Sequence, residues 1–89
     1  MAKFDRFQVR HLESERTFRA LGLSQRAARG LIRAGVLGPT SLRQTPWSDE
    51  EAGARYVSLE WRLSVDPACD TKVLAEVARV RAELGQQHP

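Results

Sequence analysis

The chain has 89 residues, of which 42% are hydrophobic and 28% charged, and its formal net charge at pH 7 is +3. This composition indicates one ordinary globular domain and excludes a long disordered chain. No apolar run approaches the roughly 20 residues of a membrane-spanning helix, and the N-terminal residues lack the hydrophobic stretch of a signal peptide. Cys69 is the lone cysteine, which excludes an intrachain disulfide and leads us to expect a cytoplasmic protein.

Basic residues are concentrated in one part of the chain. The stretch 16–45 contains no Asp or Glu, whereas acids gather at 49–51 and from residue 60 onward. The arginines of the acid-free stretch are Arg16, Arg19, Arg26, Arg29, Arg33 and Arg43. Such a stretch is typical of a surface that binds phosphate, and solvated arginines on a small protein are the alternative explanation.

The first segment, 1–10, mixes aromatic and charged residues and fits either an extended segment or a frayed first helical turn. From 11 to 21 the pattern is helical, since Phe18 and Leu21 recur at the three-residue spacing of a helix face, and Gly22 is a natural stop. We therefore expect an N-terminal extension (1–10), a helical domain (11–85) and a disordered tail (86–89).

The segment 24–34 predicts a helix with two chemically different faces. Ser24 can cap its start, because the hydroxyl can accept an unpaired N–H of the first turn, and Gly35 can end it in the left-handed conformation. At about 100° per residue, three basic residues fall within roughly 60° of one another on one side. These residues are Arg26, Arg29 and Arg33, and the opposite side carries Ala28, Leu31 and Ile32. One face can therefore be buried while the other is exposed to a partner.

Glycine and proline between 35 and 39 predict a turn, and a single helical turn over 41–44 is expected to carry Leu42 into the core. The segment 48–63 predicts one longer helix, opened by a capping box of Ser48 and Glu51. Its main apolar stripe consists of Ala52, Tyr56, Leu59 and Leu63, and a second stripe consists of Val57 and Trp61. Both sides of this helix are therefore expected to be covered.

The last predicted helix begins with Asp66 as its N-cap and Pro67 at the first helical position. Its apolar residues recur at helical spacing up to an end near Gly85; they are Val73, Val77, Val80 and Leu84. No segment predicts a strand. The expected fold class is all-α: a compact single domain of four or five short helices with helix-hairpin-helix or helix-turn-helix character.

The sequence lacks the residue clusters on which most enzymes depend. Its two histidines are His11 and His88, and with a single cysteine no zinc-ligand spacing occurs. No glycine-rich phosphate-binding motif is present, and helix caps or turns explain the serines. We therefore predict a protein that is not an enzyme and has no cofactor and no metal site. Both Trp47 and Trp61 are expected in the core, the alternative being exposed rings that stack on single-stranded bases.

Two groups of residues form a recognisable pattern. The first surrounds the predicted helix 24–34 and comprises 21–27, 31, 33–36 and 42. The second lies near the C-terminus and comprises Lys72, Leu74, 76–77 and 84–85. This pattern resembles the C-terminal domain of the bacterial RNA polymerase alpha subunit, a compact helix-hairpin-helix domain that binds the DNA minor groove and contacts transcription regulators. The resemblance implies DNA contacts at Arg26 and Lys72. The chain departs from the family at Arg29, where the family has asparagine, and at Asp70, where it has glycine.

A second pattern overlaps the first. It comprises 22–24, Arg26, Arg29, Gly35, 37–39 and then 47–50. It resembles the helix-turn-helix of MerR-type and excisionase proteins, in which the second helix enters the major groove. The segment that would form the wing of that family, 40–46, is several residues short. The two resemblances imply different grooves for the same arginines.

The first functional hypothesis is a small non-enzymatic nucleic-acid-binding domain related to transcription in a bacterium or phage, for duplex DNA, with RNA as the alternative. Arg26, Arg29 and Arg33 are the expected direct contacts. Arg16, Arg19 and Arg43 are expected to contact phosphates at the periphery. Backbone amides near Ser24 or Gly35 can add contacts to phosphate.

The second hypothesis is a protein-interaction module that uses the predicted helix 48–63. Its partner would be RNA polymerase, another bacterial or phage protein, or a second copy of the chain. The expected contact residues are Val57, Glu60 and Trp61, because two apolar stripes exceed what one small core requires. The sequence leaves the oligomeric state open.

Overall fold

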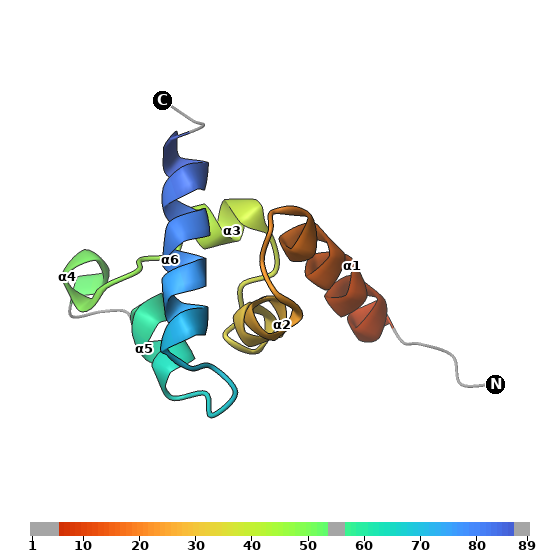
Figure 1. Ribbon diagram of the computed structural model, residues 1–89, viewed down its shortest axis with the longest axis horizontal. Coiled ribbons are helices and arrows are strands. Elements are labelled where there is room, and N and C mark those ends of the chain that lie inside the picture. The colour runs from red at the N-terminus through yellow and green to blue at the C-terminus, as the bar shows by residue number, and fades with distance from the viewer. Residues whose placement is uncertain (1–5, 54–56, 87–89) are drawn as a thin grey trace.

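The computed structural model describes residues 6–53 and 57–86, with side chains from residue 11 onward, and these residues form six helices and no strand (Figure 1). The helices are α1 (Arg6–Ala20), α2 (Gln25–Arg33), α3 (Pro39–Gln44), α4 (Asp49–Ala52), α5 (Leu59–Ser64) and α6 (Thr71–Gln86). The predicted all-α class is therefore confirmed. α2 packs against α1 on one side and against α6 on the other, and α3 and α5 also contact α6.

The hydrophobic core gathers around α6. Its buried side chains are those that the predicted stripe contains, Val73, Val77, Val80 and Leu84. Phe18 of α1, Leu31 of α2 and Leu42 of α3 are fully buried against them. Burying a large aliphatic or aromatic side chain contributes roughly 1.5–3 kcal/mol to folding. This core therefore fixes α2 between its neighbours, with one side of α2 left at the surface.

Two glycines end α1 and α2 in the same way. Gly22 has φ +94° and Gly35 has φ +90°, a region that side chains with a Cβ rarely adopt. After α2, the N–H of Gly35 donates to the carbonyl of Ile32 at 3.0 Å, and the N–H of Val36 donates to the carbonyl of Leu31 at 2.9 Å. This is the Schellman pattern of hydrogen bonds, which satisfies the last carbonyls of a helix. The predicted left-handed end at Gly35 is confirmed.

The prediction of one helix over 48–63 is wrong. α4 ends at Gly53, which has φ +67°, and α5 begins only after Ser58, whose Oγ accepts a hydrogen bond from the N–H of Trp61 at 3.1 Å. The amides of Leu59 and Glu60 donate to carbonyls of 46–47, so the chain folds back at this point. Tyr56 lies outside the described residues. Apolar residues four apart fit two short helices as well as one long helix, and the cap at Ser58 decides between them.

Three further boundaries differ from the expected ones. α6 begins at Thr71 and not at Pro67, because Asp70 provides the cap: its Oδ1 accepts from the N–H of Val73 at 3.0 Å. Asp66 instead accepts from the N–H of Ala68 at 2.9 Å within a turn. α1 begins at Arg6, so half of the predicted extension 1–10 is helical, and α6 runs to Gln86, one residue into the predicted tail. The rest of the predicted tail, 87–89, lies outside the described residues.

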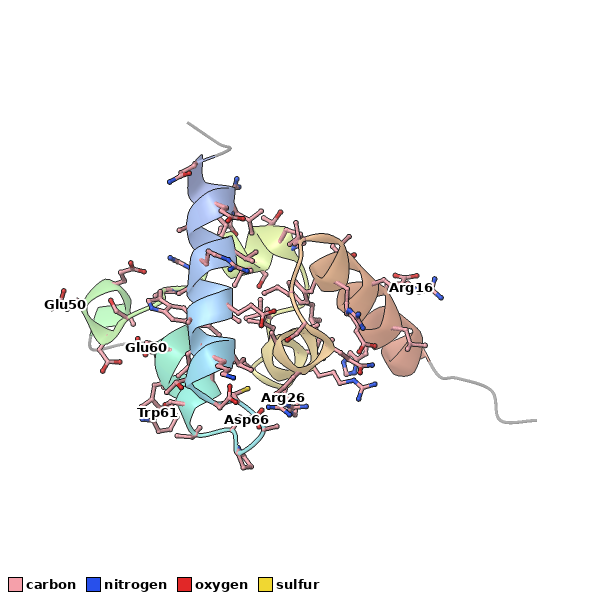
Figure 2. All side chains as sticks on the ribbon, in the orientation of Figure 1. Arg16, Arg26, Glu50, Glu60, Trp61 and Asp66 are labelled. Carbon is pink, nitrogen blue, oxygen red and sulfur yellow. The ribbon has the colours of Figure 1, made fainter. Side chains whose placement is uncertain are left out.

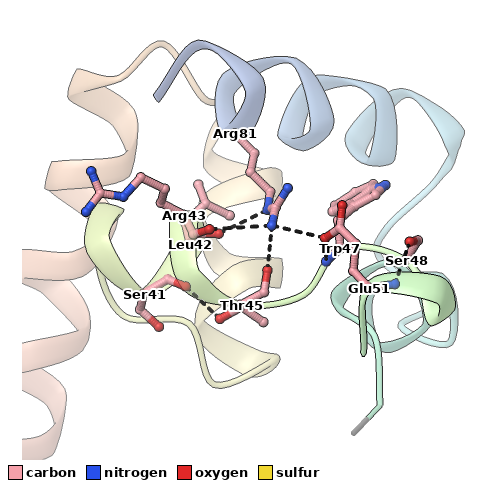
Figure 3. A network of polar contacts seen from close by, with 8 residues as sticks. All are labelled: Ser41, Leu42, Arg43, Thr45, Trp47, Ser48, Glu51 and Arg81. Atoms are coloured by element: carbon pink, nitrogen blue, oxygen red, sulfur yellow. Dashed lines mark hydrogen bonds and ion pairs between the residues drawn. The ribbon is translucent and has the colours of Figure 1, made fainter. Parts of the chain in front are cut away.

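The predicted capping box at α4 is present, with a shift of one residue. Ser48 Oγ accepts from the N–H of Glu51 at 3.3 Å, and Glu51 Oε2 accepts from the N–H of Trp47 at 2.8 Å (Figure 3). The carboxylate therefore reaches the residue before the N-cap. Trp47 is partly buried against the core, as expected for this tryptophan.

The guanidinium of Arg81, on α6, joins the C-terminal end of α3 to the start of α4 (Figure 3). Its Nε donates to the carbonyl of Leu42 at 3.2 Å, and its Nη2 donates to the carbonyls of Arg43 and Thr45 at 3.4 and 2.9 Å. Nη2 also lies 3.3 Å from Glu51 Oε2. Because the last carbonyls of a helix have no partner inside it, Arg81 satisfies the end of α3. No local sequence pattern indicates this role.

Candidate nucleic-acid interface

The three arginines of α2 share its solvent-exposed side. The side chains of Arg26, Arg29 and Arg33 are 63, 57 and 47% exposed, while Ala28 and Leu31 on the other side are fully buried. The predicted division of α2 into an apolar face and a cationic face is therefore confirmed. The predicted cap is also present, since Ser24 Oγ accepts from the N–H of Ala27 at 3.2 Å.

Each arginine of α2 forms an ion pair with a carboxylate from another part of the chain. Arg26 Nη1 lies 3.4 Å from Asp70 Oδ2. Arg29 Nε lies 2.9 Å from Glu15 Oε1, on α1. Arg33 Nε lies 2.7 Å from Asp66 Oδ2 (Figure 2 labels Arg26 and Asp66). No local sequence signal indicates these partners, because the paired residues are 14 to 44 positions apart.

Every one of these pairs uses a single nitrogen of the guanidinium. A guanidinium has five N–H donors, and these side chains are 47–63% exposed, so each arginine keeps donors that a ligand can reach. An exposed ion pair is worth only about 0–1 kcal/mol, because water screens it. A phosphate can therefore bind the outer edge of each arginine while the carboxylate remains in place.

The two shorter pairs, at 2.9 and 2.7 Å, hold the Nε atom of their arginines. The carboxylates of Glu15 and Asp66 are only 16 and 14% exposed, whereas Asp70 is 50% exposed and meets a terminal nitrogen of Arg26. The hydrogen bonds of Arg29 and Arg33 to these carboxylates thus use Nε and no terminal nitrogen. Asp70 instead occupies a terminal nitrogen that a phosphate would use.

In the pair of Arg33 and Asp66, the pKa values of both partners are shifted by their contact. Their hydrogen bond raises the pKa of Arg33 and lowers the pKa of Asp66, because each charge stabilises the other. Cys69 lies beside the pair, and burial raises the pKa of its thiol. A Cβ on Gly30 would meet Cys69 Sγ at 2.6 Å, so the 66–70 segment and α2 approach closely only because residue 30 is glycine.

Two arginines of α1 adjoin this surface. Arg16 and Arg19 are exposed and line a hollow of ≈ 360 Å³ together with Glu15 and Gln25, the first residue of α2. Neither guanidinium forms an ion pair with a carboxylate in the part of the chain that the structure describes. The structure therefore places Arg16 and Arg19 next to the start of α2.

Of the other two predicted contacts, Lys72 adjoins the arginine surface of α1 and α2 and Arg43 does not. Lys72 is exposed at the start of α6, two residues from Asp70. The pKa of Asp70 is lowered chiefly by the N–H of Val73, and the charges of Arg26 and Lys72 add to this, so Lys72 adjoins the Arg26 end of α2. Arg43 lies on α3 and lines a small separate pocket with Pro39, Thr40 and Leu84. Arg43 is therefore not part of the α1–α2 surface.

The backbone amides of Ser24 and Gly35 are already hydrogen-bonded within the protein. Glu76, on α6, accepts from the N–H of Ser24, and its Oε2 accepts from the Ser24 hydroxyl at 3.1 Å. The N–H of Gly35 donates to Ile32 within the end of α2. The amides of Ser24 and Gly35 themselves therefore already have acceptors within the protein, and phosphate contacts from the neighbouring amides stay a prediction.

A second exposed surface lies on α5. Val57, Trp61 and Val65 are 47, 53 and 57% exposed, and Glu60 beside them is also exposed (Figure 2). The expectation that Trp61 is in the core is wrong. α5 directs Leu59 and Leu63 inward, and Trp61 lies two residues from each, on the opposite side of the helix. Trp61 and Val65 line an open groove of ≈ 660 Å³ with Arg33, Ala34, Arg62, Asp66, Pro67 and Ala68.

Comparisons with known proteins detect no similarity: no protein-family model matches the chain, and no characterised protein or solved structure does. The resemblances to the alpha-subunit domain and to the helix-turn-helix proteins therefore remain predictions.

Within 6–53 and 57–86, no helix is both long and apolar enough to cross a membrane. The same residues contain no group of three His, Cys, Asp or Glu side chains placed to hold a metal ion.

Proposed function

We propose that the protein is a non-enzymatic nucleic-acid-binding domain that contacts the phosphates of duplex DNA through α1 and α2. The observation that carries this proposal is the group of five exposed arginines on two packed helices: Arg16, Arg19, Arg26, Arg29 and Arg33. Four nearby carboxylates, the ion-paired Glu15, Asp66 and Asp70 and the Glu76 that accepts from Ser24, offset part of this charge. The remaining positive charge and the unused N–H donors suit a phosphate backbone, which attracts arginine without regard to sequence.

The resemblance to the RNA polymerase alpha-subunit domain supports duplex DNA over RNA and a role in transcription. The charges of Arg26 and Lys72, the two contacts that the resemblance implies, both act on Asp70. The sequence of α2 contains no aromatic residue. Stacking of unpaired bases is therefore not expected there, since binding of single strands depends on aromatic platforms.

The test measures binding of a short fluorescein-labelled DNA duplex by anisotropy at increasing salt concentrations. With about 3–5 phosphates neutralised, log K should fall against log salt with a slope of about −3 to −5. The double variant Arg26→Ala with Arg29→Ala should weaken binding at low salt by at least about tenfold. Arg79→Ala, at an exposed arginine of α6 that forms no ion pair in the described structure, is the matched control. An affinity that does not depend on salt contradicts the proposal.

A second candidate function is protein–protein interaction through α5, and the exposure of Trp61 favours it. An exposed tryptophan flanked by two exposed valines is an apolar surface of the kind that partners cover. Trp61→Ala should then abolish a protein complex or self-association while the duplex affinity stays unchanged. Sedimentation of the wild-type chain over a range of concentrations tests for a second copy as the partner.

A further inference from the structure

The hollow between α1 and the start of α2 differs from the rest of the arginine surface in its charge balance. The arginines of α2 each have a carboxylate partner, whereas Arg16 and Arg19 have none among the described residues. Glu15, the one acid that lines the hollow, is engaged by Arg29 at 2.9 Å. The hollow therefore holds two cations that form no ion pair with a carboxylate of the described residues, beside a Glu15 carboxylate that is paired with Arg29.

The spacing of the two arginines suits a shared ligand. Residues three apart on a helix are neighbours on its surface, so the guanidinium groups of Arg16 and Arg19 lie on one side of α1. Two like charges at this spacing repel each other, and an anion between them removes that repulsion. Gln25 completes the hollow from α2 with an uncharged amide that can donate hydrogen bonds.

We propose that this hollow, formed by Arg16, Arg19 and Gln25, is a phosphate-binding subsite for an internal phosphodiester of duplex DNA. The proposal rests on the proposed function and adds where one phosphate of the backbone is held. Arginine binds phosphate with two parallel N–H donors, and two arginines can share the two free oxygens of one phosphodiester. The open hollow, ≈ 360 Å³ in volume, admits a phosphate group that is part of a chain.

The subsite makes Arg16 and Arg19 direct contacts and not peripheral ones. A phosphate bound between them lies beside Gln25, one residue before Arg26, so the same strand can continue to the arginines of α2. The carboxylate of Glu15 limits the subsite on one side and holds Arg29 by its Nε. α1 and α2 would thus hold successive phosphates of one strand.

The experiment compares variants that change one positive charge at different places. Arg16→Gln and Arg19→Gln remove a cation from the hollow, and Arg79→Gln removes one from the exposed surface of α6. The probe is a short fluorescein-labelled duplex without terminal phosphates, measured by anisotropy at several salt concentrations. Each hollow variant should bind about tenfold more weakly and reduce the magnitude of the salt slope by about 1. Arg79→Gln should change neither quantity beyond about twofold.

Gln25→Ala should weaken binding without changing the salt slope, because the amide carries no charge; Gln86→Ala is its control on α6.

Equal binding by Arg16→Gln, Arg19→Gln and Arg79→Gln overturns the subsite while the proposed function survives. Absence of duplex binding by the wild-type chain at low salt overturns the proposed function itself. If a duplex with 5′-phosphates binds much more tightly and only this gain depends on Arg16 and Arg19, the subsite takes a terminal phosphate, and the proposal of an internal phosphodiester is wrong. Thermal unfolding of each variant verifies that the fold is intact.

Discussion

Arg81 and Arg26 are the same residue type in opposite situations. Arg81 is 21% exposed and donates to three backbone carbonyls and a carboxylate, whereas Arg26 is 63% exposed and meets one carboxylate at 3.4 Å. The difference lies in the acceptors that the fold offers. α3 ends beside Arg81 with carbonyls that need donors, while the outer side of α2 offers Arg26 only a side chain in solvent. Arg81 therefore stabilises the fold, and Arg26 remains available for a ligand.

The largest expected effect is on Arg81. Arg81→Ala should lower the free energy of unfolding by about 2–4 kcal/mol, because the carbonyls at the end of α3 lose a charged donor. For a domain of this size that corresponds to a fall in Tm of roughly 10–20 °C, measured by circular dichroism. Arg81→Lys should recover only part of the loss, since lysine lacks the planar fork that reaches several acceptors.

Arg79→Ala is the control for that experiment, because Arg79 lies on α6 two residues before Arg81 and is exposed. Its free energy of unfolding should change by less than about 0.5 kcal/mol. If Arg81→Ala is as stable as Arg79→Ala, the network in Figure 3 contributes nothing to stability, and Arg81 does not differ from Arg26 in this respect.

The double variant Arg26→Ala with Arg29→Ala should show the opposite profile. Its free energy of unfolding should fall by less than about 1 kcal/mol, because both lost pairs are exposed to solvent. Its duplex affinity at low salt should fall by at least about tenfold. A large loss of stability with an unchanged affinity would assign these two arginines to the fold instead.

A smaller effect of opposite sign is expected at Asp70. Asp70→Asn should strengthen duplex binding about two- to fivefold at low salt, because the carboxylate competes for a terminal nitrogen of Arg26 and repels phosphate. Asparagine can still accept from the N–H of Val73, so the start of α6 should be unaffected. Glu83→Gln makes the same charge change on the exposed end of α6 and should alter the affinity less. If Asp70→Asn changes the affinity less than this control, Asp70 does not compete with phosphate for Arg26.

The smallest expected effect is a dependence of stability on pH from Asp66. Its pKa is lowered in the folded protein, chiefly by the hydrogen bond from Arg33, so its contribution is complete above the ordinary carboxyl pKa and is lost as pH falls through the lower folded value. The window therefore lies below about pH 4. Asp66→Asn should remove this part of the acid destabilisation in urea titrations performed at several pH values. An unchanged acid limb would show that the pair with Arg33 does not contribute.

The sequence predicted most of what depends on neighbouring residues. The cap at Ser24, the left-handed end at Gly35 and the buried stripe of α6 are local patterns, and the structure contains all of them. The break between α4 and α5 was not predicted, because apolar residues continue at helical spacing through it. The cap by Ser58 also depends on backbone contacts with Pro46 and Trp47.

The candidate site was predicted in outline and not in its charge balance. The position of Arg26, Arg29 and Arg33 on one face followed from helical spacing alone, whereas their carboxylate partners lie far away in the sequence. The same holds for Arg81, whose acceptors are 30 to 39 residues distant. Which arginine faces a carbonyl and which faces solvent is a property of the packed helices.

The carboxylate of Glu76 closes the N-terminal end of α2, where it accepts from both the amide and the hydroxyl of Ser24. A helix whose first amides are open can meet a phosphate with its tip. In α2 the Glu76 carboxylate occupies the amide of Ser24, so a phosphate aligned with the helix axis at this residue would be repelled, whereas the hollow beside Gln25 lies toward α1. A DNA backbone on this surface would therefore approach α2 from the side, parallel to its row of arginines, and the helix would not insert end-first.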